Sequence, residues 1–264
     1  MDFNDFYLYL FLGAFAGIAA GLLGIGGGLI IVPALVWIFH QQGFDSTIIM
    51  HLALGTSLAS IVFTSLSSIW AHHQKNGIMW RVFWKLSPGI MFGAWLGATI
   101  VYFLPTKSLT FLFGLFELYV ALQMTTNIKP KPQRQLPQNL GMTATGGGIG
   151  FISAIMGIGG GTLTVPFLVW CNIHIRKAIA TSAACGLPIA IAGSIGFLLT
   201  GWEQTSRPEY SLGYLYLPAL LGIVMTSVLF APIGAWLTHY LATGSLKKVF
   251  ALLLYILAAK MLLF

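Results

Sequence analysis

The chain has 264 residues, of which only 7% are charged and 57% are hydrophobic, and its mean hydropathy is +0.87. An ordinary soluble domain carries about 25% charged residues, and with so few the surface would be one contiguous apolar patch. The composition therefore excludes a soluble enzyme and a disordered chain, and it predicts an integral membrane protein. The formal net charge of +7 does not indicate nucleic-acid binding, because the Lys and Arg residues form short clusters between apolar runs.

Ten apolar segments follow one another along the chain. The first five lie at about 6–23, 29–40, 47–71, 80–104 and 108–126. After a polar, proline-rich stretch, five more lie at about 140–157, 162–173, 177–200, 212–241 and 245–264. Most of them are long enough to cross about 30 Å of hydrocarbon as helices, but 29–40 and 162–173 are too short. We expect an all-α integral membrane protein.

The two groups of five segments are copies of one unit. Residues 24–37 read GIGGGLIIVPALVW and residues 157–170 read GIGGGTLTVPFLVW, so ten of fourteen positions are identical. The sequence predicts two repeats of about five helical segments each, including one short half-helix per repeat. The expected boundaries are a first repeat at 1–126, a cytoplasmic linker at 127–139 and a second repeat at 140–264.

The distribution of charge predicts how the repeats are oriented. If every segment crosses the membrane, ten Lys and Arg residues fall on one side and three on the other, where most of the acidic residues also lie. The positive-inside rule then places the ten in the cytoplasm and both termini outside. Asp2 and Asp5 stand where a signal peptide carries positive charge, so we expect a retained first span. Five segments per repeat make the second repeat inverted relative to the first, as in many secondary transporters.

Each short segment opens with four glycines in five residues. Such a run breaks a helix, and broken backbone at membrane depth is tolerated only where it is buried in protein or lines a watery cavity. The helix that follows presents unpaired N–H groups and a partial positive charge, which attract anions. We therefore expect an anion site where the two motifs meet. The alternative reading is close helix packing, for which small residues are common in membranes.

The paired GIGGG-x4-P motifs, each followed by an Ala-x-x-Thr-Ser segment, resemble the TauE/SafE family of sulfite exporter-like permeases, also called the 4-toluene sulfonate uptake permease family. The resemblance extends from about residue 8 to 262 and implies a multi-pass permease of the bacterial inner membrane. It also implies transport of sulfite, sulfonates, thiosulfate or related anions. The expected substrate-binding residues are Gly24, Gly26, Gly27, Gly28, Thr56, Ser57, Gly157, Gly159, Gly160, Gly161, Thr162, Thr181 and Ser182.

The hydroxyl residues of this set allow two interpretations. They can donate hydrogen bonds to substrate oxygens, or they can bond back to a carbonyl one turn earlier, which is common in membrane helices. Thr162 and Thr164 replace Leu29 and Ile31 of the first copy. If hydroxyls line the site, we expect the second repeat to supply more of them.

Glu117 lies in the middle of an apolar segment, FLFGLFELYVALQM. A charged side chain at bilayer depth costs roughly 2.5–3.5 kcal/mol on insertion scales, so it indicates a function such as proton coupling. The alternative is a protonated Glu117 that is hydrogen-bonded to a neighbouring helix.

These observations predict a secondary transporter that moves a small sulfur-containing anion by alternating access. A passive anion channel, a carrier of another small organic anion, and an intramembrane enzyme or a subunit of a larger complex are the alternatives. The sequence contains no nucleotide-binding motif, no metal-ligand spacing and no catalytic motif. We expect no cofactor, metal, nucleotide or nucleic-acid partner and no enzymatic activity, and the sequence leaves a homo-oligomer open.

Overall fold

The computed structural model describes residues 3–23, 27–126, 135–237 and 243–263, and within these ranges the chain forms ten helices and one hairpin. The first half contains α1 (Phe3–Leu23), α2 (Gly28–Gln41), α3 (Ile49–Gln74), α4 (Trp80–Val101) and α5 (Thr106–Thr126). The second half contains α6 (Asn139–Ile155), α7 (Gly161–Trp170), α8 (Ile175–Thr200), β1 (Ser211–Leu212), β2 (Leu215–Tyr216), α9 (Leu217–Leu237) and α10 (Thr243–Leu263). Each expected apolar segment corresponds to one helix, and α2 and α7 are the two short ones.

The segment expected at 212–241 differs from the structure at its start. Ser211 pairs with Tyr216, and Leu212 pairs with Leu215, in a short antiparallel hairpin. Gly213 forms the turn with a φ of 58°, a left-handed conformation that glycine adopts without steric cost. Hydropathy alone does not distinguish this apolar hairpin from the first turns of a helix, so the prediction of one continuous segment is wrong here.

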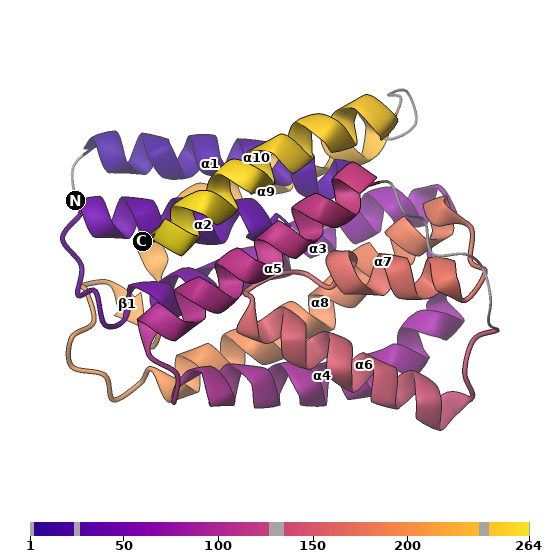
Figure 1. Cartoon of the computed structure of the whole chain (residues 1–264), viewed down its shortest axis with the longest axis horizontal. Coiled ribbons are helices and arrows are strands. Elements are labelled where there is room, and N and C mark those ends of the chain that lie inside the picture. Colours follow the sequence, from indigo (N-terminus) through magenta and orange to yellow (C-terminus); the bar gives the residue numbers. More distant parts are fainter. Residues whose placement is uncertain (1–2, 24–26, 127–134, 238–242, 264) are drawn as a thin grey trace.

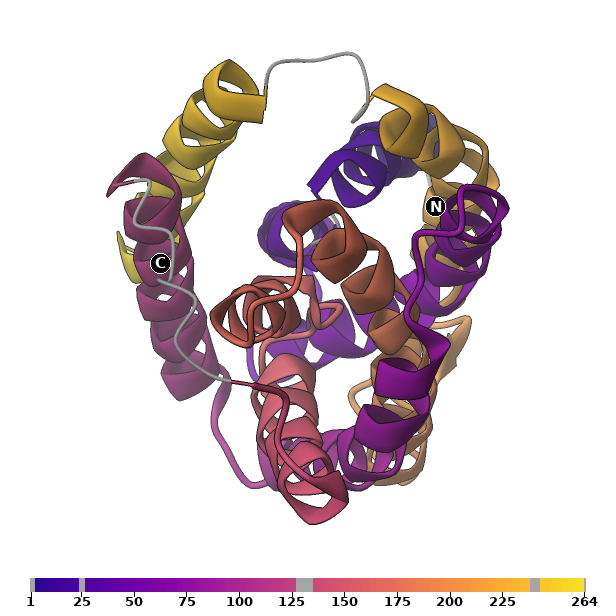
Figure 2. The same cartoon turned by 90° about the vertical axis from the view of Figure 1, so that its right-hand side faces the viewer.

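The helices run roughly along one long axis (Figure 1). Helix α1 begins and α10 ends at the same end of the molecule, on the left in Figure 1, whereas α5 ends and α6 begins at the opposite end. We call these the terminal end and the linker end. Figure 2, which looks onto the linker end, shows α2 and α7 toward the middle of the bundle and the α5–α10 pair at one side.

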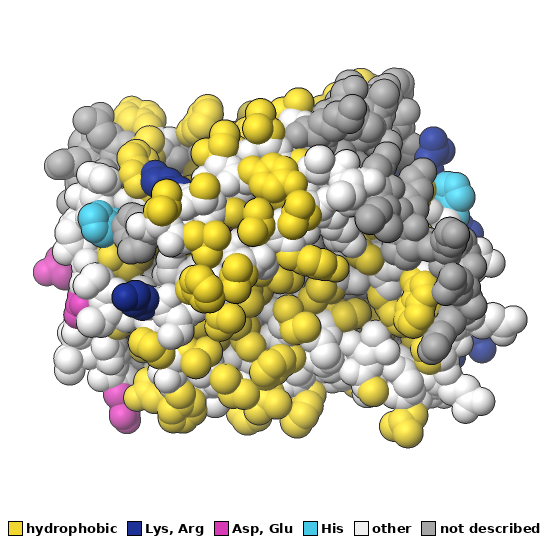
Figure 3. Space-filling view, in the orientation of Figure 1, with side chains coloured by type: hydrophobic (Ala, Val, Ile, Leu, Met, Phe, Trp, Pro, Cys, Tyr) yellow, Lys and Arg dark blue, Asp and Glu magenta, His cyan; other side chains and the backbone are white. Residues whose placement is uncertain are grey.

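The surface has the character of a membrane protein. Hydrophobic side chains form a broad band around the middle, and the visible acidic side chains lie at the terminal end (Figure 3). Within the described residues, four helices are long and apolar enough to cross a membrane, namely α3, α5, α8 and α9. The residues 127–134 of the expected linker lie outside the described ranges.

Glycines line the closest helix pairs. Helix α1 packs along α9, and α4 packs along α6. The glycines at this contact on α1 and α4 recur every four residues, at positions 13, 17 and 21 and at positions 89, 93 and 97. A Cβ at any of them would lie within 3.0 Å of the partner's backbone, a small-residue arrangement typical of membrane helices. Much of the glycine in this chain therefore serves close packing.

The remaining contacts follow the order of the two halves. Helix α3 packs against α8, and α5 packs against α10. Helix α4 contacts α8, and α9 contacts α3. If each helix of the first half is exchanged with its counterpart in the second half, α1–α9 becomes α4–α6 and α4–α8 becomes α3–α9, while α3–α8 and α5–α10 stay the same pairs.

Candidate functional site

The two glycine motifs meet inside the bundle. Gly28, the first residue of α2, packs against the carbonyl oxygen of Gly157 and the backbone of Ile158, leaving no room for a Cβ. The hydroxyl of Ser57 on α3 donates a hydrogen bond of 2.8 Å to the same Gly157 carbonyl. Gly157 itself has a φ of 60°, so it turns the chain between α6 and α7 in a conformation that favours glycine. The contact joins the start of α2 to the turn that precedes α7.

Neither short helix has a side-chain cap. The cap residues are Gly27, with a φ of 73°, and Gly160. Their carbonyls accept the first intrahelical bonds, from Ile31 N at 3.0 Å and from Thr164 N at 2.7 Å. Because glycine has no side-chain oxygen, it cannot accept a bond from the first N–H groups of its helix. Both helix starts therefore carry partial positive charge. Gly24 and Gly26 lie outside the described residues.

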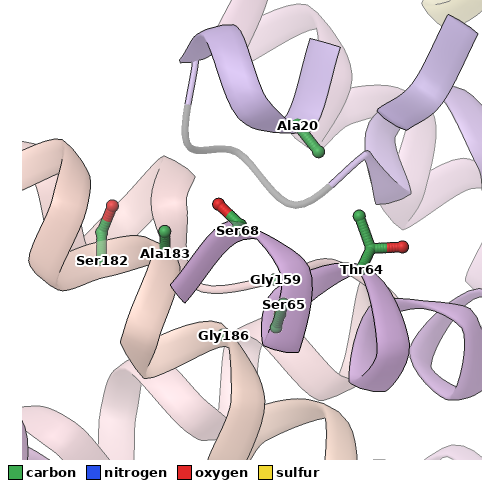
Figure 4. Close-up of a pocket in the computed structure, with 8 residues that line it drawn as sticks. All are labelled: Ala20, Thr64, Ser65, Ser68, Gly159, Ser182, Ala183 and Gly186. Atoms are coloured by element: carbon green, nitrogen blue, oxygen red, sulfur yellow. The ribbon is translucent and has the colours of Figure 1, made fainter. Parts of the chain in front are cut away.

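A small pocket lies beside Gly159, in the glycine turn between α6 and α7 (Figure 4). Its volume of about 10 Å³ is room for about one water molecule. It lies between the linker-end halves of α3 and α8, and its lining residues all have neutral side chains. They are Ala20, Thr64, Ser65, Ser68, Gly159, Ser182, Ala183 and Gly186.

The hydroxyls of this pocket differ in their partners. Thr64 Oγ1 donates to the Ser60 carbonyl at 3.0 Å and lies 2.9 Å from Ser227 Oγ. Ser182 Oγ donates at 2.8 Å to a carbonyl three residues earlier, as the back-bonding alternative expects. Ser68 is only 4% exposed, yet its Oγ has no hydrogen-bond partner among the described residues. A buried unpaired polar group costs about 1–3 kcal/mol, and a polar ligand that bonded to this hydroxyl would remove that cost.

Thr56 and Thr181 hold neighbouring segments in place. Thr56 Oγ1 accepts a hydrogen bond of 2.9 Å from the backbone N–H of Tyr216, and Thr181 Oγ1 accepts one of 3.0 Å from that of Met79. Tyr216 directly precedes α9, and Met79 directly precedes α4. The two threonines thus make equivalent contacts in the two halves, and neither lines the pocket.

The distribution of hydroxyls differs from the expectation that the second half supplies more of them. Helix α3 of the first half contributes Thr64, Ser65 and Ser68 to the pocket, and the second half contributes Ser182. Thr162 and Thr164 on α7 are buried, and their hydroxyls have no hydrogen-bond partner in the part of the chain that the structure describes, but neither residue lines the pocket.

Sequence reasoning missed the three hydroxyl residues of α3, although a signal is present. Thr56, Ser60, Thr64 and Ser68 recur every four residues, which places them along one face of a helix. The stripe is absent from the second half of the sequence, where the corresponding positions from Thr181 onward carry Cys, Ile and Gly.

Glu117 lies apart from the pocket. Its side chain on α5 is fully buried, and neither carboxylate oxygen has a hydrogen-bond partner among the described residues. The structure therefore does not provide the hydrogen bond that the purely structural interpretation of Glu117 requires.

Aromatic side chains close the terminal end of the bundle. Tyr216 contacts Phe39, Phe44 and Tyr9, with ring centroids 5.5, 5.1 and 6.5 Å away. Phe39 and Phe44 stack with their centroids 5.1 Å apart. The hydroxyl of Tyr9 donates to Gln42 Oε1 at 3.0 Å. We call Tyr9, Phe39, Phe44 and Tyr216 the aromatic cluster.

The two ends of the bundle differ because the halves use different connections. Between α8 and α9, the segment 201–216 carries the hairpin, whereas residues 75–79 alone join α3 to α4. A Cβ at Gly55 would lie 2.5 Å from the Tyr214 carbonyl oxygen of the hairpin. Its counterpart Ala180 instead faces Gly77 of the short connection. The departure of Ala180 from the repeat pattern thus has a structural reason, since only position 55 must admit the hairpin.

Comparison with known proteins gives consistent matches over the whole chain. The family described as "Sulfite exporter TauE/SafE" matches residues 9–261. A "Probable membrane transporter protein" of Haemophilus influenzae is 40% identical over 99% of both chains. Relatives with the same description in Methanocaldococcus jannaschii and Bacillus subtilis are 27% and 29% identical, over 97% and 70% of this chain and 95% and 76% of their own. No solved structure gives a significant match. The chain is a multi-pass membrane protein and belongs to the TauE/SafE family of membrane transporters.

Proposed function

We propose that this protein is a secondary transporter that carries a small sulfur-containing anion, of the sulfite, sulfonate or thiosulfate type, across the bacterial inner membrane. One observation carries the proposal: the uncapped start of α7 follows Gly159 of a neutral pocket, in which the hydroxyl of Ser68 is buried and has no hydrogen-bond partner among the described residues. Backbone N–H groups at a helix start and hydroxyl donors are the groups that bind oxyanions. The name of the matching family supports a sulfur oxyanion as the first substrate to test.

The substrate would bind between the pocket and the glycine segments that precede α2 and α7. Gly27, Gly28 and Gly160 would present their N–H groups, and Ser68 would donate a hydrogen bond to a substrate oxygen. The N–H of Gly161 already donates to the Gly159 carbonyl oxygen at 2.6 Å. The pocket holds about one water in this conformation. Binding of a sulfur oxyanion therefore requires α3 and α8 to separate near the linker end.

We infer that the repeats 1–126 and 140–264 are inverted copies. Two observations support this. The helix contacts made by one half recur between the counterpart helices of the other half. Helix α1 begins at the terminal end, whereas α6 begins at the linker end, so the two halves start from opposite ends of the bundle (Figure 1). Inverted repeats with broken helices at the membrane midplane support transport by rocking one part of the protein against the other.

The two ends suggest which conformation this is. The aromatic cluster fills the terminal end, whereas the pocket lies in the linker-end half of the bundle. The charge distribution supports a cytoplasmic position for the linker end. In our proposal the protein is closed toward the outside here, and it opens outward when the aromatic cluster separates.

Transport by the purified protein in liposomes tests the proposal. We expect saturable sulfite uptake with counterflow exchange, and a concentration for half-maximal uptake that rises about tenfold in Ser68→Ala, because a hydrogen bond to a charged group contributes about 1.5–3 kcal/mol. The matched control is Ser194→Ala, since Ser194 is also a buried hydroxyl of the bundle without a partner but lies outside the pocket. Flux that does not saturate would instead indicate a channel, and the absence of flux would contradict transport of sulfite by this chain alone.

Glu117→Gln tests the proposed role of the buried carboxylate in proton coupling. The glutamine keeps the shape of the side chain but cannot bind or release a proton, so we expect uptake to continue while its dependence on pH is lost. The other titratable groups described on α5 and on the helices packed against it are Lys107, Tyr119, His51, His72, His73, Tyr255 and Lys260. Uptake of methanesulfonate, which does not titrate between pH 5 and 8, is measured across that range. If it changes with pH equally in the variant and in the original protein, Glu117 is not the coupling group.

A further inference from the structure

We propose that the pocket selects its ligand by charge, and that it binds monoanions in preference to dianions of the same shape. This inference rests on the proposed anion transport and concerns which ionic form the site accepts.

The first argument is the absence of a formal counter-charge in the lining. The eight residues around the pocket are Ala, Gly, Ser and Thr. The described Lys and Arg side chains nearest in sequence stand at helix ends, where Lys75 follows α3 and Arg176 and Lys177 lie in the first turn of α8. All three are exposed. A bound anion would therefore interact with dipoles and hydrogen-bond donors in place of a buried cation.

The second argument is the amount of positive charge that the backbone supplies. A helix start is equivalent to about +0.5 elementary charge, so even two helix starts together supply no more than about +1. Helix α7 begins two residues after Gly159, which lines the pocket, whereas the start of α2 lies against Gly157, which does not line it. The backbone therefore supplies at most enough positive charge to balance one negative charge, and it leaves a second one uncompensated.

The third argument is desolvation. The cost of moving an ion from water into a medium of low dielectric grows with the square of its charge, so it is about fourfold larger for a dianion than for a monoanion of equal size. Ser68 Oγ, buried and without a partner, provides a neutral donor that can replace one of the lost water contacts. Such a hydroxyl donor can bond to an oxygen of either ion. Its contribution offsets the smaller desolvation cost of the monoanion but not the larger cost of the dianion.

Binding of methanesulfonate and sulfate to the purified protein tests the inference, because both are small tetrahedral sulfur oxyanions and differ in charge. Calorimetric titration at constant ionic strength should give a Kd for methanesulfonate at least about tenfold lower than for sulfate, which corresponds to about 1.4 kcal/mol. Equal affinities, or tighter binding of sulfate, would overturn charge selection.

Two variants separate charge from hydrogen bonding. Ser68→Ala should weaken methanesulfonate binding without reversing the preference, whereas Ser68→Lys should shift the ratio at least about tenfold toward sulfate, because it adds a buried counter-charge. Ser194→Ala should change neither affinity. A ratio that stays the same in a folded Ser68→Lys protein would contradict the inference, as would a reversed ratio in Ser68→Ala.

The same measurements distinguish this inference from the transport proposal on which it rests. Saturable sulfite uptake in liposomes together with equal affinities for the two probes would overturn charge selection alone. If neither probe binds and no uptake is observed, both proposals fail.

Discussion

Replacing Gly28 by alanine is expected to reduce transport at least about tenfold and to lower the thermal stability of the protein. The new Cβ would overlap the carbonyl oxygen of Gly157 and would lie 2.8 Å from the Cα of Ile158. Both obstacles are backbone atoms, so no side-chain rotation relieves the clash. Overpacking of this kind costs about 1–3 kcal/mol. The clash falls on a described contact between the two glycine motifs, so it would push apart the segments that our proposal assigns to anion binding.

Gly148→Ala is the matched control for this change. Gly148 also belongs to a run of glycines, in α6, but a Cβ added to it would meet nothing within 4 Å. We expect its uptake rate and melting temperature to equal those of the unmodified protein. Normal uptake in both glycine variants would contradict the account, because it would show that contact between the motifs is not needed for transport.

Replacing Tyr216 by alanine is expected to open the terminal end. The Tyr216 ring contacts the other three members of the aromatic cluster, and truncating a large buried aromatic side chain typically costs about 3–5 kcal/mol. That loss falls on the conformation in which the cluster is packed, so the population shifts toward the conformation that is open at the terminal end. We expect sulfite binding from the outside to become stronger and net uptake to slow, because return to the closed state becomes less favourable.

Leu212→Ala is the control for the loss of an apolar side chain from the same hairpin, since Leu212 is 43% exposed and lies outside the aromatic cluster. We expect its uptake kinetics to match those of the original protein. If Tyr216→Ala behaves like this control, the aromatic cluster does not govern access from the terminal end.

The glycine motifs could be located from the sequence because their chemistry is local. Four glycines in five residues break a helix wherever they occur, so the starts of α2 and α7 were predictable. Their meeting at Gly28 and Gly157 followed from the duplication, because symmetric copies tend to bring equivalent segments together.

The pocket and the hairpin could not be predicted from the sequence, because they depend on features that a hydropathy pattern does not contain. Ser65 and Ser68 on α3 line the pocket together with residues 182, 183 and 186 of α8, and only the packing of these two helices shows that they share a common space. The hairpin residues 211–216 (SLGYLY) continue directly into the apolar sequence of α9, so hydropathy does not mark where the helix begins. Their hairpin depends on one left-handed turn and on the space above Gly55, which belongs to a distant part of the chain.

The accessibility of position 68 tests the central claim most directly, which is that the pocket beside the glycine turns is a substrate site reached alternately from the two ends. The experiment uses Ser68→Cys in a protein whose Cys171 and Cys185 are replaced by Ala, with a membrane-impermeant thiol reagent applied to either face of the membrane. Our account predicts labelling from the linker end that sulfite slows, and additional labelling from the terminal end when Tyr216→Ala is introduced. Labelling that sulfite does not affect, or that occurs only from the terminal end before Tyr216 is changed, would contradict it.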